Sequence, residues 1–209
     1  MKRPLVNGSV NLLRRSLLAG CVAAVAGCDR LTSIGAKPQF HATDITGADF
    51  GRSLALPDID GRMRTLADFK GKVTVIFFGY TQCPDVCPTT MAEIAEVKKL
   101  LGKDGDRVQG VFVTIDPERD TPEILKGYVT SFDPNFIALR GNAEQTAAAA
   151  KEFKVFYAKV AGKSPGSYTM DHTAASYVLD TEGRVRLFVR YGSEPTALAA
   201  DVKALLKAG

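Results

Sequence analysis

The sequence predicts an α/β fold in which a mixed β-sheet is flanked by helices on both faces. Two observations support this fold class. Apolar, β-branched runs alternate with segments of helical periodicity, and the last two strand-like runs are joined by a short turn that predicts an antiparallel hairpin. The chain has 209 residues, of which 45% are hydrophobic and 24% are charged. Those values are typical of one globular domain and exclude a disordered chain.

The first part of the domain, residues 43–72, contains strand-like segments separated by turn signals. Thr46-Gly47 and Asp60-Gly61 are typical turn pairs, so short added hairpins are expected at the N-terminal side of the fold. The run VTVIFFGY at 73–80 is uncharged, β-branched and aromatic. It predicts a central strand that is buried on both faces.

Helical periodicity follows this strand. Apolar side chains recur on one face of the expected helix, namely Met91, Ile94, Val97 and Leu101. Pro88 suits its first turn, because a proline lacks the N–H that would have no intrahelical partner there.

The remaining elements continue the alternation. Strands are expected at 107–116, 136–140, 154–160, 173–180 and 184–191, and helices at 121–132, 143–153 and 194–208. The Gly/Ser/Pro-rich segment 161–171 is expected to be a flexible loop that ends against His172. This order matches the thioredoxin arrangement, with cysteines between a central strand and the next helix. It predicts a thioredoxin-like mixed sheet flanked by helices, with an added N-terminal hairpin.

Residues 1–27 are interpreted as an export signal. Basic residues precede the uncharged apolar stretch at 16–27; they are Lys2, Arg3, Arg14 and Arg15. That stretch is too short for a helix across a bilayer of about 30 Å, which takes about 20 residues. Its length and flanks fit a signal-peptide core. Arg14-Arg15 also weakly resembles a twin-arginine signal, so the export route stays open.

The export signal ends at a cysteine in either of two ways. Leu18–Cys21 and Val25–Cys28 both resemble the lipobox of bacterial lipoproteins. Cys28 is the preferred lipidation site, with Cys21 as the alternative, because cleavage before Cys21 leaves too short an apolar core. Asp29 resembles an inner-membrane retention signal. The predicted organisation is therefore a signal peptide at 1–27, a tether at 28–42 and a domain at 43–209, lipid-anchored on the periplasmic face of a bacterial inner membrane.

Removal of the signal changes the charge balance. The number of Lys plus Arg residues falls from 27 to 23, which equals the 23 Asp plus Glu residues. The basic character of the whole chain therefore belongs to the signal, and it gives no support for a nucleic-acid partner.

Cys83 and Cys87 form a CxxxC motif whose chemistry is open between a structural disulfide, a redox pair and part of a metal site. Cys87 precedes Pro88 near a helix N-terminus, where the helix dipole favours the thiolate. The redox motif of thioredoxins is CxxC, so the extra residue weakens the interpretation as a redox pair without excluding it. The loop also contains Pro84 and Asp85, which a pair of buried core cysteines would not need.

The chain offers two histidines as further ligands. His41 lies in the expected tether and is predicted to be solvated, whereas His172 begins an expected strand beside Asp171. Two thiolates and one imidazole are a soft, three-ligand set that suits copper best. Structural zinc usually has four protein ligands.

Three stretches in order, GYTQCPDVCPTT, VTIDPERDTPE and DHTAASYVLD, resemble the Sco/SenC family of copper proteins. The resemblance covers about residues 40–207. It implies a thioredoxin-like fold and copper, as Cu(I) or Cu(II), bound by Cys83, Cys87 and His172. It also implies help in building the CuA centre of cytochrome c oxidase subunit II, by copper delivery, by reduction of the target cysteines, or by both. A periplasmic copper donor and a thiol reductant are then further partners.

Several roles stay open. A metallochaperone is favoured over an enzyme, and the alternative is an extracytoplasmic thiol–disulfide oxidoreductase in which Cys83 and Cys87 form a redox-active disulfide. A peroxidase-like enzyme is a third possibility. Asp171 is a candidate partner of His172, and Asp85 is either a docking charge or a turn residue. The charged segment 116–123 either shapes the surroundings of the site or simply links a strand to a helix.

Overall fold

A six-stranded mixed sheet forms the centre of the computed structural model, which describes residues 39–208. The strand order is β1–β10–β9–β4–β5–β6. The bounds of these strands are Thr43–Asp44 for β1, Val73–Gly79 for β4, Val108–Thr114 for β5, Ile137–Leu139 for β6, Ala175–Leu179 for β9 and Val185–Arg190 for β10. Strands β4, β5 and β6 run parallel, and β9 pairs with the other edge of β4 in the antiparallel sense.

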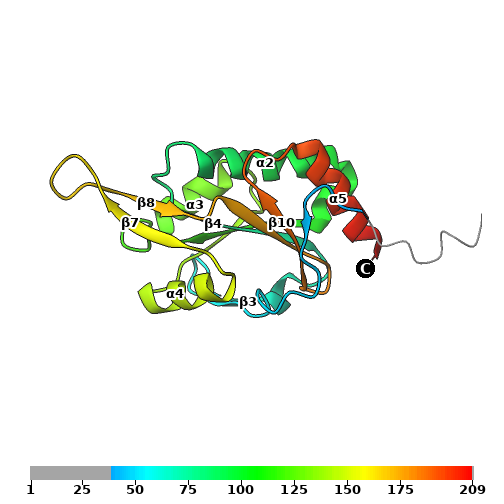
Figure 1. The fold of residues 1–209 in the computed structure, drawn as a ribbon, viewed down its shortest axis with the longest axis horizontal. Helices are drawn as coiled ribbons and strands as arrows, with labels where there is room; N and C mark the ends of the chain where they lie inside the picture. Colours follow the sequence, from blue (N-terminus) through cyan, green and yellow to red (C-terminus); the bar gives the residue numbers. More distant parts are fainter. Residues whose placement is uncertain (1–38, 209) are drawn as a thin grey trace, which may run out of the picture. The chain divides into compact units, whose positions relative to one another are not determined.

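Helices and a small hairpin cover the two faces of the sheet. The helical elements are η2 Leu66–Phe69, α2 Val86–Leu100, η3 Gly102–Arg107, α3 Pro122–Thr130, α4 Ala143–Glu152 and α5 Pro195–Ala208. Figure 1 shows α2, α3 and α5 on one side of the sheet and α4 with β3 on the other. The predicted mixed sheet with helices on both faces is therefore confirmed. Among the described residues, none of the helices has the length and apolar character needed to cross a membrane.

Strand β4 is buried along all seven of its residues, as its uncharged sequence predicts. It lies between β5 and β9 in the sheet and is covered on both faces. Phe77 and Phe78 point to opposite faces and are each completely buried. The strand that leads into the cysteine loop is therefore paired at both edges and buried on both faces.

The N-terminal hairpin is only partly as expected. Strands β2 Ala55–Pro57 and β3 Met63–Thr65 pair in the antiparallel sense, and Gly61 adopts φ 79° in the turn between them. The turn at Thr46-Gly47 closes no hairpin, because Thr43–Asp44 pairs with β10 instead. The open edge of β10 satisfies backbone groups that such a short segment cannot satisfy locally.

The expected tether ends earlier than residue 42. Phe40 and Ala42 pack against the core, and the backbone N–H groups of His41 and Ala42 donate to the buried carboxylate of Asp201. The His41 ring is 62% exposed, yet its Nδ1 lies 2.9 Å from Asp201 Oδ1, so it is not simply solvated. The export signal and the two candidate lipidation cysteines, Cys21 and Cys28, lie outside the described residues.

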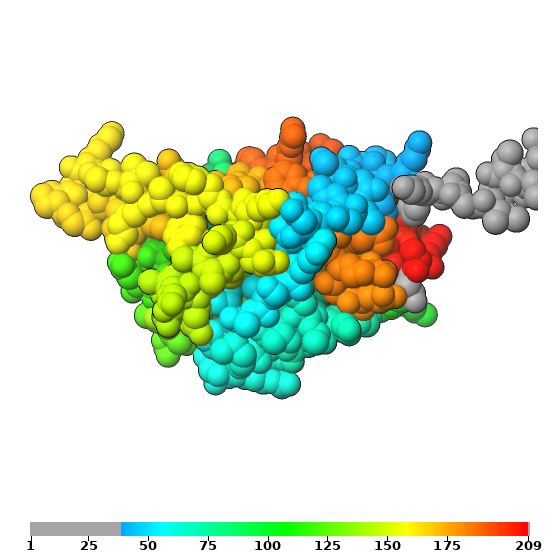
Figure 2. All heavy atoms as spheres, turned by 60° about the horizontal axis from the view of Figure 1, so that its bottom comes forward, coloured from blue at the N-terminus to red at the C-terminus, as the bar shows by residue number. Residues whose placement is uncertain are grey.

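A separate two-stranded ribbon contains the strand predicted at 154–160, and its second strand is formed by part of the segment predicted to be a loop. Strands β7 Tyr157–Ala161 and β8 Tyr168–His172 pair with each other in the antiparallel sense and not with the main sheet. Lys154 adopts φ 53° after α4, so the chain turns before β7 can begin. Figures 1 and 2 show this ribbon, in yellow, projecting at one end of the domain. It carries His172, which ends β8 and does not begin β9.

Candidate metal centre

The two cysteines lie at the junction between β4 and α2. Cys83 is half-buried in the connecting loop, and Cys87 is completely buried as the second residue of α2. Both are free thiols. The backbone N–H of Cys87 donates to Cys83 Sγ across 3.4 Å, so an amide at the helix N-terminus points at the first sulfur.

His172 reaches the same place from the end of β8. Its Nε2 lies 3.4 Å from Cys87 Sγ, and its ring makes edge contacts with Phe77 and Tyr80 at centroid distances of 5.8 and 6.0 Å. The two sulfur atoms and the ring nitrogen all lie within 4.8 Å of one another. The structure thus brings together the three side chains that the sequence singled out, although 85 residues separate the last two.

The tautomer of His172 follows from its second hydrogen bond. Nδ1 lies 3.1 Å from the carbonyl oxygen of Thr173, which can only accept. Nδ1 is therefore the protonated nitrogen, and Nε2 presents its lone pair to the sulfurs. Burial lowers the pKa of His172, which favours this neutral form. A backbone carbonyl that orients a ligand histidine in this way is a common support in metal sites.

The protonation of Cys87 differs from the expectation. Burial raises the pKa of this thiol well above its ordinary value, and this outweighs the helix N-terminus that favours the thiolate. The metal-free site therefore holds a protonated Cys87, whose S–H faces the lone pair of His172 Nε2. A metal ion that binds there must displace that proton.

The size of the cluster fits one metal ion. Metal–sulfur and metal–nitrogen bonds of about 2.3 and 2.0 Å place three trigonal ligand atoms roughly 4 Å apart. The observed limit of 4.8 Å needs only a small contraction. In the part of the chain that the structure describes, this is the one group of three or more His, Cys, Asp or Glu side chains with such spacing. The softness of its donors suits copper.

Gly79 is a site residue that sequence reasoning missed. A Cβ at this position would lie 2.8 Å from Cys87 Sγ and 2.8 Å from the Phe77 ring. Real side chains essentially never approach so closely, so the last position of β4 must lack a side chain for Cys87 to occupy its place. A single glycine at the end of a strand gives no such signal before the helix is placed against it.

The charged segment 116–123 shapes the surroundings of the site. Asp120 is completely buried and accepts hydrogen bonds from the backbone N–H and the hydroxyl of Thr81 and from the hydroxyl of Thr114. Burial raises the pKa of Asp120. This carboxyl group ties the start of the cysteine loop to the end of β5, two residues before Cys83.

The two other acidic candidates lie at the surface. Asp85 occupies the N-cap position of α2, and its exposed carboxylate accepts from Thr89 and Tyr191 at 3.5 and 3.4 Å. Asp171 is exposed on β8, and the carbonyl of Thr173 takes the place at His172 Nδ1 that Asp171 was a candidate to fill.

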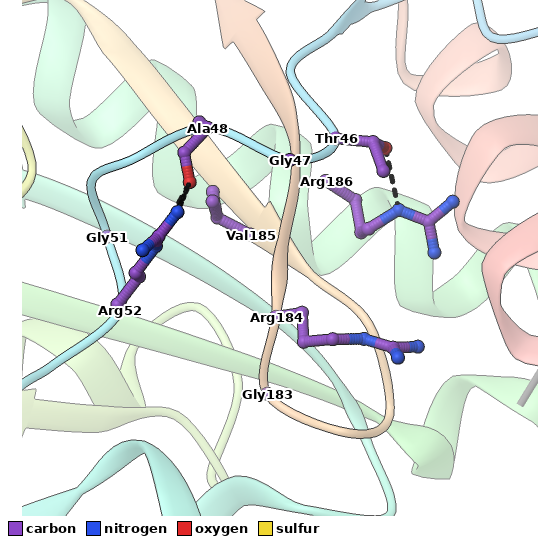
Figure 3. Close-up of a pocket in the computed structure, with 9 residues that line it drawn as sticks. All are labelled: Thr46, Gly47, Ala48, Gly51, Arg52, Gly183, Arg184, Val185 and Arg186. Carbon is purple, nitrogen blue, oxygen red and sulfur yellow. Dashed lines mark hydrogen bonds between the residues drawn. The ribbon is translucent and has the colours of Figure 1, made fainter.

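A cavity of about 580 Å³ lies elsewhere, between the 46–52 loop and the start of β10. Figure 3 shows its three arginines on opposite sides of β10, with Arg52 bonded to Ala48 and Arg186 bonded to Thr46. Arg184 and Arg186 also contact the Asp180 carboxylate. Because the arginines are paired and do not converge, this cavity does not compete with the cysteine site.

Sequence comparison assigns the family. The SCO1/SenC family model matches residues 42–207. The chain belongs to the SCO1/SenC family. A relative from Rickettsia felis, described as "SCO2-like protein", is 37% identical over 154 residues, which cover 73% of this chain and 75% of that protein.

Solved structures of Sco proteins share the fold. Bradyrhizobium japonicum ScoI with copper bound is 44% identical and has a TM-score of 0.68; the match covers 75% of this chain and 99% of that one. Yeast Sco1 with copper bound is 27% identical and has a TM-score of 0.70; the match covers 78% of this chain and 91% of that one. The thioredoxin-like arrangement predicted from the element order is confirmed.

Proposed function

We propose that this Sco-family chain binds one copper ion through Cys83, Cys87 and His172. The main support is that the ligand atoms of these three side chains lie within 4.8 Å of one another, although the cysteines come from the β4–α2 region and the histidine comes from a separate ribbon. Two soft thiolates and an imidazole with a free Nε2 lone pair suit copper. The copper-bound structures of the Bradyrhizobium and yeast relatives lend support.

Copper in this proposal is a cargo. Cys83 and His172 are only half-buried, so one side of the site is open to a donor or an acceptor, whereas Cys87 is closed off in the core. The family resemblance supports delivery to the CuA centre of cytochrome c oxidase subunit II, with a periplasmic copper donor upstream. The chain is then a metallochaperone.

A second candidate function is thiol–disulfide exchange. Both thiols are free, and their sulfur atoms lie within 4.8 Å of each other, which supports a disulfide as a second state of this pair. In this reaction Cys83 and Cys87 lose two protons and two electrons as they form their disulfide, and a disulfide in the target gains them and becomes a dithiol. A thiol reductant in the periplasm would restore the pair.

Anchoring completes the proposal. Cys28, or alternatively Cys21, carries the lipid that holds the domain on the periplasmic face of the inner membrane. Two or more acyl chains anchor stably where a single chain is marginal. Fractionation of Cys28→Ser and Cys21→Ser cells tests this: release or failed processing is expected for Cys28→Ser alone, and the reverse result would move the anchor to Cys21.

Copper titration of the purified full-length protein tests the binding function. The reduced protein should bind one equivalent, and Cys83→Ser or Cys87→Ser should abolish tight binding. The disulfide form should also fail to bind, because copper needs deprotonated thiols. Equal uptake by the oxidised and reduced forms would falsify the proposal.

The His172→Ala variant separates delivery from reduction in cells. Deletion of the protein should lower cytochrome c oxidase activity in copper-poor medium and leave quinol oxidases, which lack CuA, unaffected. A delivery protein should fail with His172→Ala, whereas a dithiol reductant should survive a change that keeps both thiols. Full oxidase activity in the deletion strain would contradict both roles.

A further inference from the structure

Arg119, in the charged segment 116–123, stands between the ribbon that carries His172 and the loop that carries the cysteines. Its Nε donates to the carboxylate of Asp116, which is only 2% exposed. This buried partner fixes the base of the guanidinium, so the remaining N–H groups have a defined direction. A charge-assisted pair of this kind is among the stronger hydrogen bonds in proteins.

The guanidinium group of Arg119 contacts the start of β8 in two ways. Arg119 Nη1 donates to the carbonyl of Tyr168 across 2.9 Å, and the guanidinium carbon lies 3.6 Å from the centroid of the Tyr168 ring. The Tyr168 hydroxyl in turn donates to Asp116 Oδ1 across 2.9 Å. Both the backbone and the side chain at the start of β8 are therefore attached to the same ion pair.

The second contact reaches the cysteine loop. Arg119 Nη1 also donates to Gln82 Oε1 across 3.1 Å, and Gln82 immediately precedes Cys83. The guanidinium lies 5.7 Å from the ring of Tyr80, and that ring makes the edge contact with His172. One side chain thus connects the charged segment 116–123, the cysteine loop and the start of β8, the strand that ends at His172.

The ribbon needs such an attachment. Strands β7 and β8 pair only with each other, and Met170 is the one buried residue of these two strands. An isolated two-stranded ribbon is marginally stable in water. His172 lies four residues beyond Tyr168, at the end of a strand about 13 Å long. Tyr168 pairs with Ala161 near the tip of the ribbon, and His172 pairs with Tyr157 at its base. A ribbon that is free at Tyr168 can turn about this base, and the His172 ring would turn with it.

We propose that Arg119 is a positioning residue of the metal centre: by joining Asp116, Tyr168 and Gln82, it holds the His172 ribbon against the cysteine loop. The positioning of His172 is inferred from these contacts alone, and the effect of Arg119 on copper binding rests on the proposed function. Loss of Arg119 should leave two thiolates that still suit Cu(I), and it should remove the imidazole that completes the three-ligand set.

The first measurement uses the reduced, copper-free, full-length protein and NMR. Nuclear Overhauser contacts from the His172 ring to Phe77 and Tyr80 should be present in the unchanged protein. In Arg119→Met they should weaken severalfold or vanish, while contacts between Tyr177 and Phe188 in the main sheet persist. Arg119→Lys should restore them only in part, because an ammonium cannot stack on Tyr168 and reach Gln82 together.

Lys159→Met is the matched control. Lys159 also places a cation on Tyr168, at 4.0 Å from the ring, but it is paired with exposed Glu118 and makes no contact with the cysteine loop. Its removal should leave the His172 contacts unchanged. If Arg119→Met does not fold, Tyr168→Phe and Gln82→Ala, each of which removes one hydrogen bond, should weaken the same contacts to a smaller degree.

The second measurement uses copper. Arg119→Met should lose the histidine nitrogen signal from the Cu(II) electron paramagnetic resonance spectrum and bind Cu(II) on the order of 10-fold more weakly, as outer-shell changes typically do. Its Cu(I) affinity should change less. If Arg119→Met folds and its His172 ring contacts are unchanged, the inference is overturned whether or not copper binds. If Arg119→Met does not fold, unchanged His172 contacts in both Tyr168→Phe and Gln82→Ala overturn it. Absence of copper from the unchanged protein would instead contradict the proposed function.

Discussion

The main sheet and the β7–β8 ribbon each position part of the candidate metal centre, but the two regions differ in how much of their surface is buried. Strand β4, which leads to the cysteines, buries all seven residues between two neighbouring strands and covered faces. In β8, which carries His172, only Met170 is buried. The candidate site therefore combines two thiols beside the packed sheet with one imidazole on a weakly supported ribbon.

Hydrogen exchange should show the largest difference between the two regions. Amides of β4 and β5 are expected to exchange only on global unfolding, whereas those of β7 and β8 open locally. With a global stability of about 5–15 kcal/mol, the ratio of protection factors should be roughly a thousandfold or more. Mass spectrometry or NMR on the reduced protein measures this ratio. Equal protection of β8 and β4 would contradict this difference.

Gly79→Ala should damage the rigid side of the site. The new Cβ would overlap Cys87 Sγ and the Phe77 ring, so overpacking should lower the free energy of unfolding by about 1–3 kcal/mol. Copper binding should weaken with it. Gly127→Ala in α3 is the control, since nothing lies within 4 Å of its Cβ and alanine favours a helix by about 0.5–1 kcal/mol. Denaturant unfolding of both variants checks the sign of each effect.

A pair of isosteric valine changes should sharpen the comparison. Val111→Thr puts a hydroxyl in a completely buried position of β5 and should cost about 1–3 kcal/mol. Val160→Thr makes the same change in β7, where the side chain is 40% exposed, and should stay within about 0.5 kcal/mol. Equal losses in the urea midpoints would show that the ribbon is as tightly packed as the sheet.

His172→Ala should have only a small effect on the fold. The ring is half-buried and contacts Phe77 and Tyr80 from the ribbon side, so the copper-free variant should lose only about 1 kcal/mol, near the centre of the range for single substitutions. Its m-value should stay unchanged. A loss as large as the roughly 3–5 kcal/mol expected for Phe77→Ala would mean that the ribbon is part of the core.

Much of this protein could be predicted from its sequence. Uncharged β-branched runs predict β4 and β5, and the period of Met91, Ile94 and Val97 predicts α2, because burial on one face leaves a local pattern. The CxxxC motif, a single histidine near the C-terminal hairpin and the softness of these donors predict the members of the metal centre. These features depend on residue type and spacing alone.

Tertiary structure decided the rest. Three features depend on which backbone edges remain unpaired once the core has formed. They are the pairing of β1 with β10, the separate ribbon of 157–161 and 168–172, and the position of His172 at the end of a strand. The burial that raises the pKa of Cys87, and the close approach that requires Gly79, likewise come from segments far apart in the chain. Arg119 gave no local signal, because its partners Gln82 and Tyr168 lie 37 and 49 residues away. Local periodicity records which side of an element is buried, whereas such contacts exist only after the elements have packed.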